Sequence, residues 1–491
     1  MSFFCKSGFF FTRNSSVLNI LGRARVGRRV CLSGLRANRW LRLFQRFSRR
    51  SLVTQSAVFQ TGIRRVGSTV FKNLAMVEAA DLATLSAKST PKSSYPVISS
   101  RITGYWLICT SGLIFGIVVV GGLTRLTESG LSITEWKPVT GTIPPLNQEE
   151  WETEFKKYKA SPEFKQLNSH ITLDEFKFIF SMEWGHRLLG RAIGMFFVLP
   201  AVYFWSTGKL SRHVTRRVVE LTALLGLQGA IGWWMVKSGL DEEKLAERKS
   251  KPTVSQYRLT AHLGAAFLMY LGVLWTAFEI LNEHKWVRQM KSKPDKVTQL
   301  LAKLNSPALN SIRRLGFGLL ALTFVTAMSG GMVAGLDAGL VYPTFPHMGD
   351  DWIPSSSELM SPVFARKEDR SDLWWRNLLE NPTTVQLVHR ILATTTFFAI
   401  LGVHMSLIKK KAQIAKPAQK QFHAIMGLVS LQVALGITTL IYLVPIPLAA
   451  AHQAGALALL TASLAFLASV KRPRPQTVAY ISAMMKKQLL K

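Results

Sequence analysis

From residue 105 onward, the apolar residues of this chain gather into long, nearly continuous runs. Each run is about 20 residues long, which is the length that an α-helix needs to cross a hydrocarbon core of about 30 Å. A soluble domain would scatter its apolar residues in shorter periodic stretches. Although hydrophobic residues make up only 48% of the chain, their distribution predicts a polytopic membrane protein.

Eight apolar runs predict eight transmembrane helices and an all-α fold. The predicted spans are residues 105–123, 183–205, 218–236, 259–281, 315–334, 385–408, 424–443 and 448–470.

The N-terminal segment carries much of the formal net charge of +33 and contains no acidic residue before Glu78. A leader rich in Arg and Ser and free of acids is typical of a mitochondrial transit peptide. A basic arm that binds nucleic acid is the rival interpretation, but such arms rarely precede many membrane spans, so we expect no nucleic-acid partner.

These features divide the chain into six segments. We expect a transit peptide at 1–70, a matrix-side tether at 71–102, a first four-helix half at 103–281, a basic matrix linker at 282–314, a second four-helix half at 315–470 and a basic matrix tail at 471–491.

The charges of the loops predict the orientation of the helices. The loops around 209–217, 285–314 and 409–420 and the tail are basic, whereas the loops around 149–154, 241–243 and 350–368 are mixed or acidic. The positive-inside rule then places both termini in the matrix and the three long loops in the intermembrane space. We therefore expect a multi-pass protein of the mitochondrial inner membrane, surrounded by lipid.

Short motifs of the first half return in the same order in the second half. Each half has a glycine pair, a histidine followed by an arginine, a Leu-Gln pair and a second histidine, at similar offsets. Because each half has an even number of spans, both insert the same way up, which predicts two parallel pseudo-repeated four-helix bundles. The matching residues are Gly121-Gly122 and Gly330-Gly331, His186-Arg187 and His389-Arg390, Leu227-Gln228 and Leu431-Gln432, and His262 and His452.

Four histidines occupy matching positions: His186 and His262 in the first half, and His389 and His452 in the second. The predicted orientation places each near the intermembrane-space end of its helix. An ionisable group within a span is costly and is a candidate for function. A single such histidine can be a hydrogen-bonded packing residue, but two pairs at the same depth predict a binding site in each half.

A pair of histidines from two helices suits haem iron better than zinc. Zinc takes four protein ligands, or three and a water, but each half offers two histidines and few acids, and Cys109 is the one cysteine after the leader. Haem supplies four equatorial nitrogens and requires one or two axial ligands, most often histidine. We therefore expect each histidine pair to bind one haem inside a helix bundle.

Three arginines are candidates to neutralise the haem propionates. Arg187 and Arg390 each directly follow a predicted ligand, and Arg258 precedes His262 by about one turn, on the same helix face. Anchoring to lipid headgroups would explain these arginines equally well.

One acidic residue distinguishes the halves. Glu183 lies three residues before His186 and so shares its helix face, whereas the matching position in the second half is Gln386, which cannot titrate. This difference predicts that chemistry occurs in the first half and that the second haem transfers electrons. Capping of a helix N-terminus is the alternative role for Glu183.

Several longer strings resemble the mitochondrial haem A synthase family. The similarity runs from about Arg101 to Val470, and residues 124–181 lack the cysteine pair that bacterial members often carry, as fits the eukaryotic branch. The strings are GGLTRLTESGLS at 121–132, WKP at 136–138, PP at 144–145, EWGHR at 183–187 and AGLDAGLVY at 334–342.

The resemblance implies an oxidoreductase that acts on a CH group: family members oxidise a methyl group of haem O to a formyl group, making haem A for cytochrome c oxidase. It implies that His389 and His452 hold haem b as a cofactor, that His186 and His262 bind the substrate haem O, and that Glu183 is the catalytic acid. It also implies a ferredoxin-type electron donor and haem O synthase as partners, and a homo-oligomer is possible.

Two other functions remain open from the residues alone. The first is a bis-histidine b-type haem electron carrier that does not modify its haem. The second is a transporter or haem chaperone built on a parallel repeat, for which the clustering of the histidines toward one face is unfavourable.

Overall fold

The computed structural model describes residues 95–137, 140–248, 251–409 and 415–490. The predicted transit peptide and most of the predicted tether lie outside these residues. Within them the chain is helical, apart from loops and one isolated bridge between Met348 and Asp351. The predicted all-α fold is confirmed.

Eight of the described helices are long and apolar enough to cross a membrane, and each overlaps one predicted span. The prediction of a multi-pass membrane protein is confirmed. The eight helices are α3 (Arg101–Leu126), α6 (Leu173–Ser206), α7 (Arg212–Leu240), α9 (Gln256–Ser292), α11 (Leu309–Gly335), α14 (Pro382–Lys409), α15 (Lys416–Ile441) and α16 (Ile446–Val470).

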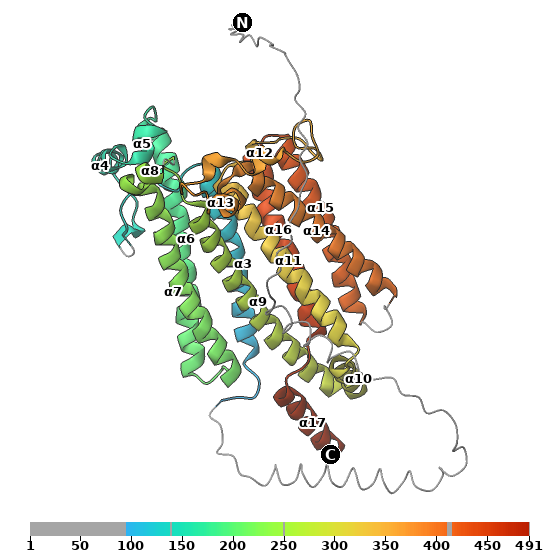
Figure 1. The fold of residues 1–491 in the computed structure, drawn as a ribbon. Helices are drawn as coiled ribbons and strands as arrows, with labels where there is room; N and C mark the ends of the chain where they lie inside the picture. Colours follow the sequence, from blue (N-terminus) through green and yellow to red (C-terminus); the bar gives the residue numbers. More distant parts are fainter. Residues whose placement is uncertain (1–94, 138–139, 249–250, 410–414, 491) are drawn as a thin grey trace, which may run out of the picture. The chain divides into compact units, whose positions relative to one another are not determined.

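The eight long helices pack in two groups that follow one another in the chain (Figure 1). In the first group α3 contacts α6 and α9, and α7 contacts α9. In the second group α11 contacts α14 and α16, and α15 contacts α14 and α16. The groups meet where α9 contacts α11 and α16, and where α3 contacts α16.

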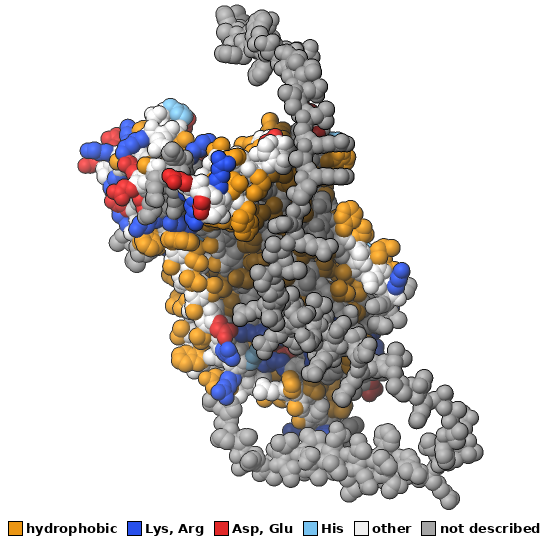
Figure 2. Space-filling model, viewed as in Figure 1, with side chains coloured by type: hydrophobic (Ala, Val, Ile, Leu, Met, Phe, Trp, Pro, Cys, Tyr) orange, Lys and Arg blue, Asp and Glu red, His pale blue; other side chains and the backbone are white. Residues whose placement is uncertain are grey.

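Large apolar side chains cover the outside of these helices as well as their core. Phe197 and Val273 are fully buried between helices, whereas Leu199 and Phe398 are 66% and 64% exposed. On the face that Figure 2 shows, hydrophobic side chains cover the middle of the helices and charged side chains gather toward both ends. This distribution suits a bundle whose outer surface faces lipid.

α3 and α11 end in the same way. Each helix is followed by a residue in the left-handed conformation seven positions after the first glycine of its pair: Glu128 at φ 52° and Asp337 at φ 50°. The turn directs the following segment against the next long helix, where the segment contacts Glu183 of α6 or Gln386 of α14.

Shorter helices lie at the two ends of the bundle (Figure 1). At one end, the segments after α3 and α7 and the segment between α11 and α14 form several short elements, and at the other end α10 (Pro294–Asn305) and α17 (Pro475–Leu489) lie together. The elements of the first end are η1 (Thr140–Thr142), α4 (Gln148–Lys159), α5 (Pro162–Gln166), α8 (Glu242–Arg248), η2 (Ala338–Leu340), α12 (Ser356–Leu359), η3 (Pro362–Phe364) and α13 (Leu373–Glu380).

The charged loop that contains α12 and α13 is anchored on the first residues of α9. Arg376 pairs with Asp372 and Glu380, and Glu380 accepts a hydrogen bond from the hydroxyl of Tyr257 at 3.0 Å. The charges of this loop therefore form an internal network that connects the second half of the chain to the first.

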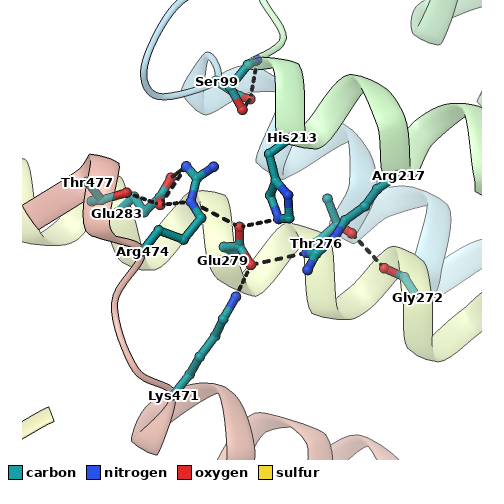
Figure 3. Close-up of polar contacts among 11 residues, drawn as sticks. Ser99, His213, Arg217, Gly272, Thr276, Glu279, Glu283, Lys471, Arg474 and Thr477 are labelled. Atoms are coloured by element: carbon teal, nitrogen blue, oxygen red, sulfur yellow. Dashed lines mark hydrogen bonds and ion pairs between the residues drawn. The ribbon is translucent and has the colours of Figure 1, made fainter. Parts of the chain in front are cut away.

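Two buried glutamates of α9 hold the other end of the bundle together (Figure 3). Glu279 lies 3.1 Å from the guanidinium of Arg217 and also pairs with Lys471. Glu283 accepts two hydrogen bonds from Arg474, each 2.8 Å long, and one from Thr477 at 2.6 Å. These contacts connect α7, α9, the end of α16 and α17.

Candidate haem-binding site

The four predicted ligands lie on four different long helices. His186 is in α6 and His262 in α9, and His389 is in α14 and His452 in α16. His186 and His262 are close enough to interact electrostatically, and so are His389 and His452. The structure therefore brings together the two members of each predicted pair.

Each of the four imidazole rings packs against a glycine of a neighbouring helix. The ring carbon Cε1 lies about 3 Å from the point where a Cβ on that glycine would be, so any larger residue would collide with the ring. The pairs and distances are Gly121 and His186 at 2.9 Å, Gly232 and His262 at 2.9 Å, Gly330 and His389 at 3.2 Å, and Gly436 and His452 at 2.9 Å.

The donor set fits haem iron. In the described part of the chain, no three His, Cys, Asp or Glu side chains come together as a compact metal site would require. Each half instead offers two imidazoles on opposing helices, which is the axial ligand set of a bis-histidine haem. Nδ1 of His186 is buried and has no hydrogen-bond partner among the described residues, so this ring is not committed to another polar contact.

The Nδ1 atoms of the other three rings have polar neighbours. His389 Nδ1 lies 2.7 Å from the hydroxyl of Ser329. His262 Nδ1 lies 3.2 Å from the amide nitrogen of Gln228, and His452 Nδ1 lies 3.1 Å from that of Gln432. The repeated Leu-Gln pair marked these two glutamines in the sequence, but only the structure shows that they contact the histidines.

Glu183 is buried beside His186 and is held by three donors. Its carboxylate accepts hydrogen bonds from the hydroxyl of Ser132 at 2.7 Å, the backbone N–H of Ile133 at 2.8 Å and the guanidinium of Arg187 at 2.6 Å. α6 begins at Leu173 with a capping box formed by Thr172 and Glu175. Glu183 therefore does not cap its own helix; it fixes the turn that follows α3.

Gln386 occupies the corresponding place in the second half. Its amide nitrogen donates to the backbone carbonyl of Ala338 at 2.9 Å and to that of Tyr342 at 3.2 Å. A neutral amide thus makes in the second half the loop contact that a carboxylate makes in the first.

The three arginines named as propionate candidates contact backbone carbonyls. Arg187 donates to Ile133 and Glu135, and Arg390 donates to Tyr342, Thr344 and His347. Arg258 donates to the carbonyl of Trp234 at 2.7 Å and lies over its ring. Arg187 and Arg390 therefore bind the segments that follow α3 and α11 to α6 and α14, the helices that carry His186 and His389.

A cavity of about 270 Å³ opens in the first half beside Arg187. Its walls are α6, α7 and the segment after α3, and α6 packs less extensively on α7 than α14 does on α15. The lining residues are Ile133, Thr134, Glu135, Trp136, Arg187, Trp233, Val236, Lys237, Leu240 and Asp241.

A second buried acid, Glu163 of α5, lies at the end of the first half that carries the short helices α4 and α5. The hydroxyl of Tyr158 donates to it at 3.1 Å. Burial, and then the nearby charge of Glu183, raises the pKa of Glu163 to about 8. No sequence pattern marked Glu163, because its burial depends on the aromatic side chains of α4 and α6.

Comparisons with known proteins find one family model and relatives that carry the same name. Residues 104–464 match the family COX15-CtaA, described as "Cytochrome oxidase assembly protein". "Heme A synthase COX15" of Saccharomyces cerevisiae is 64% identical over 376 residues, which cover 77% of this chain and 76% of the relative. The human protein of the same name is 43% identical over 374 residues, covering 76% of this chain and 84% of the relative.

One further relative carries an additional domain. "Heme A synthase-mitochondrial ferredoxin fusion protein" of Schizosaccharomyces pombe is 51% identical over 369 residues, which cover 75% of this chain and 59% of the relative.

Proposed function

Because the chain belongs to the COX15-CtaA family of cytochrome oxidase assembly proteins, we propose that it is a haem A synthase. It is a multi-pass membrane protein of mitochondria that oxidises haem O to haem A. The 64% identity with a heme A synthase over three quarters of both chains supports the activity.

The first half takes the substrate in this proposal, with His186 and His262 as the axial ligands of haem O. The observation that carries this assignment is the cavity of about 270 Å³ beside Arg187. A substrate must enter and leave, and the looser packing of α6 on α7 gives the first half a path that the tighter contact of α14 with α15 restricts in the second.

The second half holds haem b between His389 and His452 as a permanent cofactor. When bound, haem supplies the one-electron redox chemistry of its iron. Gln386 offers no titratable group there and fixes the loop through Ala338.

Glu183 acts on the substrate in the first half. Three donors fix its carboxylate on the same helix face as His186, so it is preorganised to hold a proton or to stabilise positive charge near the reacting methyl group. In a site of low dielectric constant, one carboxylate has a much larger effect than in water.

The electron donor is a ferredoxin. The fusion of a heme A synthase with a mitochondrial ferredoxin in one chain of Schizosaccharomyces pombe supports this partner. We further propose an inner-membrane location with both described ends on the matrix side, delivery of haem O by a haem O synthase, and assembly into a homo-oligomer.

The substitution Glu183→Gln tests the catalytic assignment. Gln386 shows that an amide fits the corresponding place, so the variant should fold and keep both haems. We expect haem A formation to fall by about 100-fold or more, as for the loss of a general acid or base. The measurement is the haem O to haem A ratio in pigments extracted from purified protein.

The control is Glu163→Gln, which removes another buried carboxyl of the first half that does not share a helix with a histidine ligand. It should leave the pigment ratio close to that of the wild type. Normal haem A formation by the Glu183→Gln variant would show that Glu183 is not catalytic. A wild-type protein that carries haem b alone would favour the simple electron carrier.

A further inference from the structure

The hydrogen bonding of the four histidine rings is unequal, and the difference lies between the matching rings of His186 and His389. Among the described residues, His186 has no partner for Nδ1. Nδ1 of His389 has the hydroxyl of Ser329, and Nδ1 of His262 and of His452 has the side-chain amide nitrogen of Gln228 and of Gln432. The side chain at Nδ1 matters because a hydrogen bond there fixes the tautomer and the direction of an iron-binding imidazole.

The contacts of Ser329 fix the tautomer of His389. A serine hydroxyl has one proton, and this proton points to the backbone carbonyl of Thr326, which lies 2.7 Å from Oγ. Oγ therefore accepts a hydrogen bond from Nδ1–H of His389 at 2.7 Å. Nε2 is then the nitrogen without a proton and is free to bind iron.

The first half has no such group at the matching position. Ser329 directly precedes Gly330, which contacts His389, and the residue that directly precedes Gly121, which contacts His186, is Val120. Valine has no side-chain acceptor. His186 is therefore located by its contact with Gly121 but lacks the polar contact that would fix its ring.

We propose that residues 120 and 329 decide which haem stays and which haem leaves. Ser329 is a positioning residue that holds His389 as a permanent ligand, and Val120 leaves His186 as the ligand that releases the product. This inference rests on the proposed function, because it requires a resident haem in the second half and an exchangeable haem in the first.

The test uses pairs of variants that differ by one hydroxyl. At position 329 the wild-type serine is compared with Ser329→Ala, and at position 120 Val120→Ser is compared with Val120→Ala. Each full-length protein is purified and mixed with excess apomyoglobin, and the loss of haem b and of haem O or A is followed separately from the pigments that remain.

Removing the hydroxyl of Ser329 should speed the loss of haem b by about 10-fold, since loss of an outer contact to a ligand typically costs 10- to 100-fold in metal affinity. It should also raise the midpoint potential of haem b, because a ligand that donates a hydrogen bond is a stronger donor to ferric iron. Ser329→Thr should restore the wild-type rate of haem b loss and the wild-type midpoint potential of haem b.

Adding a hydroxyl in Val120→Ser should slow the loss of haem O or A by about 10-fold relative to Val120→Ala, and it should lower kcat more than it changes KM. The inference is overturned if both hydroxyls change the two rates by less than twofold and leave the potential of haem b unchanged. The proposed function would fail in a different way, with no haem, or haem b alone, in the wild-type protein.

Discussion

Each predicted iron ligand has its position set by the absence of a side chain on the neighbouring helix. The four glycines contribute nothing but space, and a methyl group on any of them would meet the ring carbon of a histidine. The sequence showed these glycines as repeat markers, since pairs and offsets are visible in the printed residues. It did not show the contacts, because they depend on how helices distant in the chain pack.

Gly436→Ala should displace His452 and weaken haem binding in the second half. The new methyl group would lie 2.9 Å from Cε1 of the ring, and overpacking of this kind costs about 1–3 kcal/mol. We expect less haem b per protein, measured from the pyridine haemochrome, with haem O or A in the first half retained.

Gly427→Ala is the matched control for this prediction. Gly427 lies in the same helix, α15, and an added Cβ would meet nothing within 4 Å. This variant should keep its haem b. Equal loss from both variants would mean that the helix tolerates no alanine and that the contact with His452 is not the cause.

The buried carboxyl of Glu163 should make the stability of the protein depend on pH. The pKa of Glu163 is raised by burial from 4.5 to about 8, so between these values the folded protein binds more protons than the unfolded chain. Stability therefore falls as pH rises through this window, by at most about 1.4 kcal/mol per pH unit, and levels off above pH 8.

Glu163→Gln should remove this part of the pH dependence, because an amide does not titrate. The measurement is the thermal unfolding midpoint of wild type and variant between pH 5 and pH 9, at fixed detergent and salt. Identical slopes for the two proteins would exclude a raised pKa at Glu163.

At the scale of elements, apolar runs predicted every span but not where each helix ends. The run at 183–205 corresponds to α6, which begins at Leu173, and the run at 259–281 corresponds to α9, which ends at Ser292. Hydropathy records the part of a helix that lies in lipid, whereas the helix itself extends into polar surroundings, where α6 begins at the N-cap residue Thr172.

The same limit explains why the polar cluster of α9 was missed. Glu279 lies inside an apolar run, which was an available signal, but its partners Arg217 and Lys471 come from other helices. Only packing shows that Glu279 and Glu283 bind the end of α16 and the start of α17 (Figure 3).

Glu283→Gln should release α17 from α9. The side chain of Glu283 is 3% exposed and its partner Arg474 is 14% exposed, and breaking a buried ion pair typically costs about 3–5 kcal/mol. We expect faster hydrogen exchange in Pro475–Leu489, read by mass spectrometry, with haem content unchanged.

Glu220→Gln provides the comparison for that experiment. Glu220 pairs with Arg216 on the surface of α7, where the two side chains are 58% and 82% exposed, so its loss should change stability by less than about 1 kcal/mol. Unaltered exchange in α17 of the Glu283→Gln variant would show that other contacts hold this helix.

At the scale of the whole helical unit, residues 95–490, the two halves are joined by close contacts between helices. Gly335 of α11 allows the backbone of Gln256 in α9 to approach: an added Cβ would lie 2.7 Å from Cα of Gln256. Arg125, in the last turn of α3, forms an ion pair of 2.8 Å with Asp337, in the turn that follows α11. Sequence comparison of the halves predicted two bundles, but it could not predict how they meet.

Gly335→Ala should force α11 away from α9 and affect both halves together. Because the obstructing atoms include backbone, the helices must shift, at a cost of about 1–3 kcal/mol. We expect a lower unfolding midpoint and loss of haem from both halves. In contrast, Gly318→Ala in the same helix, where an added Cβ meets nothing within 4 Å, should leave the unfolding midpoint and the haem content unchanged.

The glycine pair of α3 contacts a predicted ligand of the first half and the neighbour of a predicted ligand of the second half. Gly121 faces His186, and the next residue, Gly122, faces the side chain of Gln453, the neighbour of His452 in α16. Consecutive Cα atoms are only about 3.8 Å apart, so a movement of α3 at one of these two contacts would also move the other. A movement of α3 that accompanies haem exchange in the first half should therefore change the rate of haem exchange in the second half.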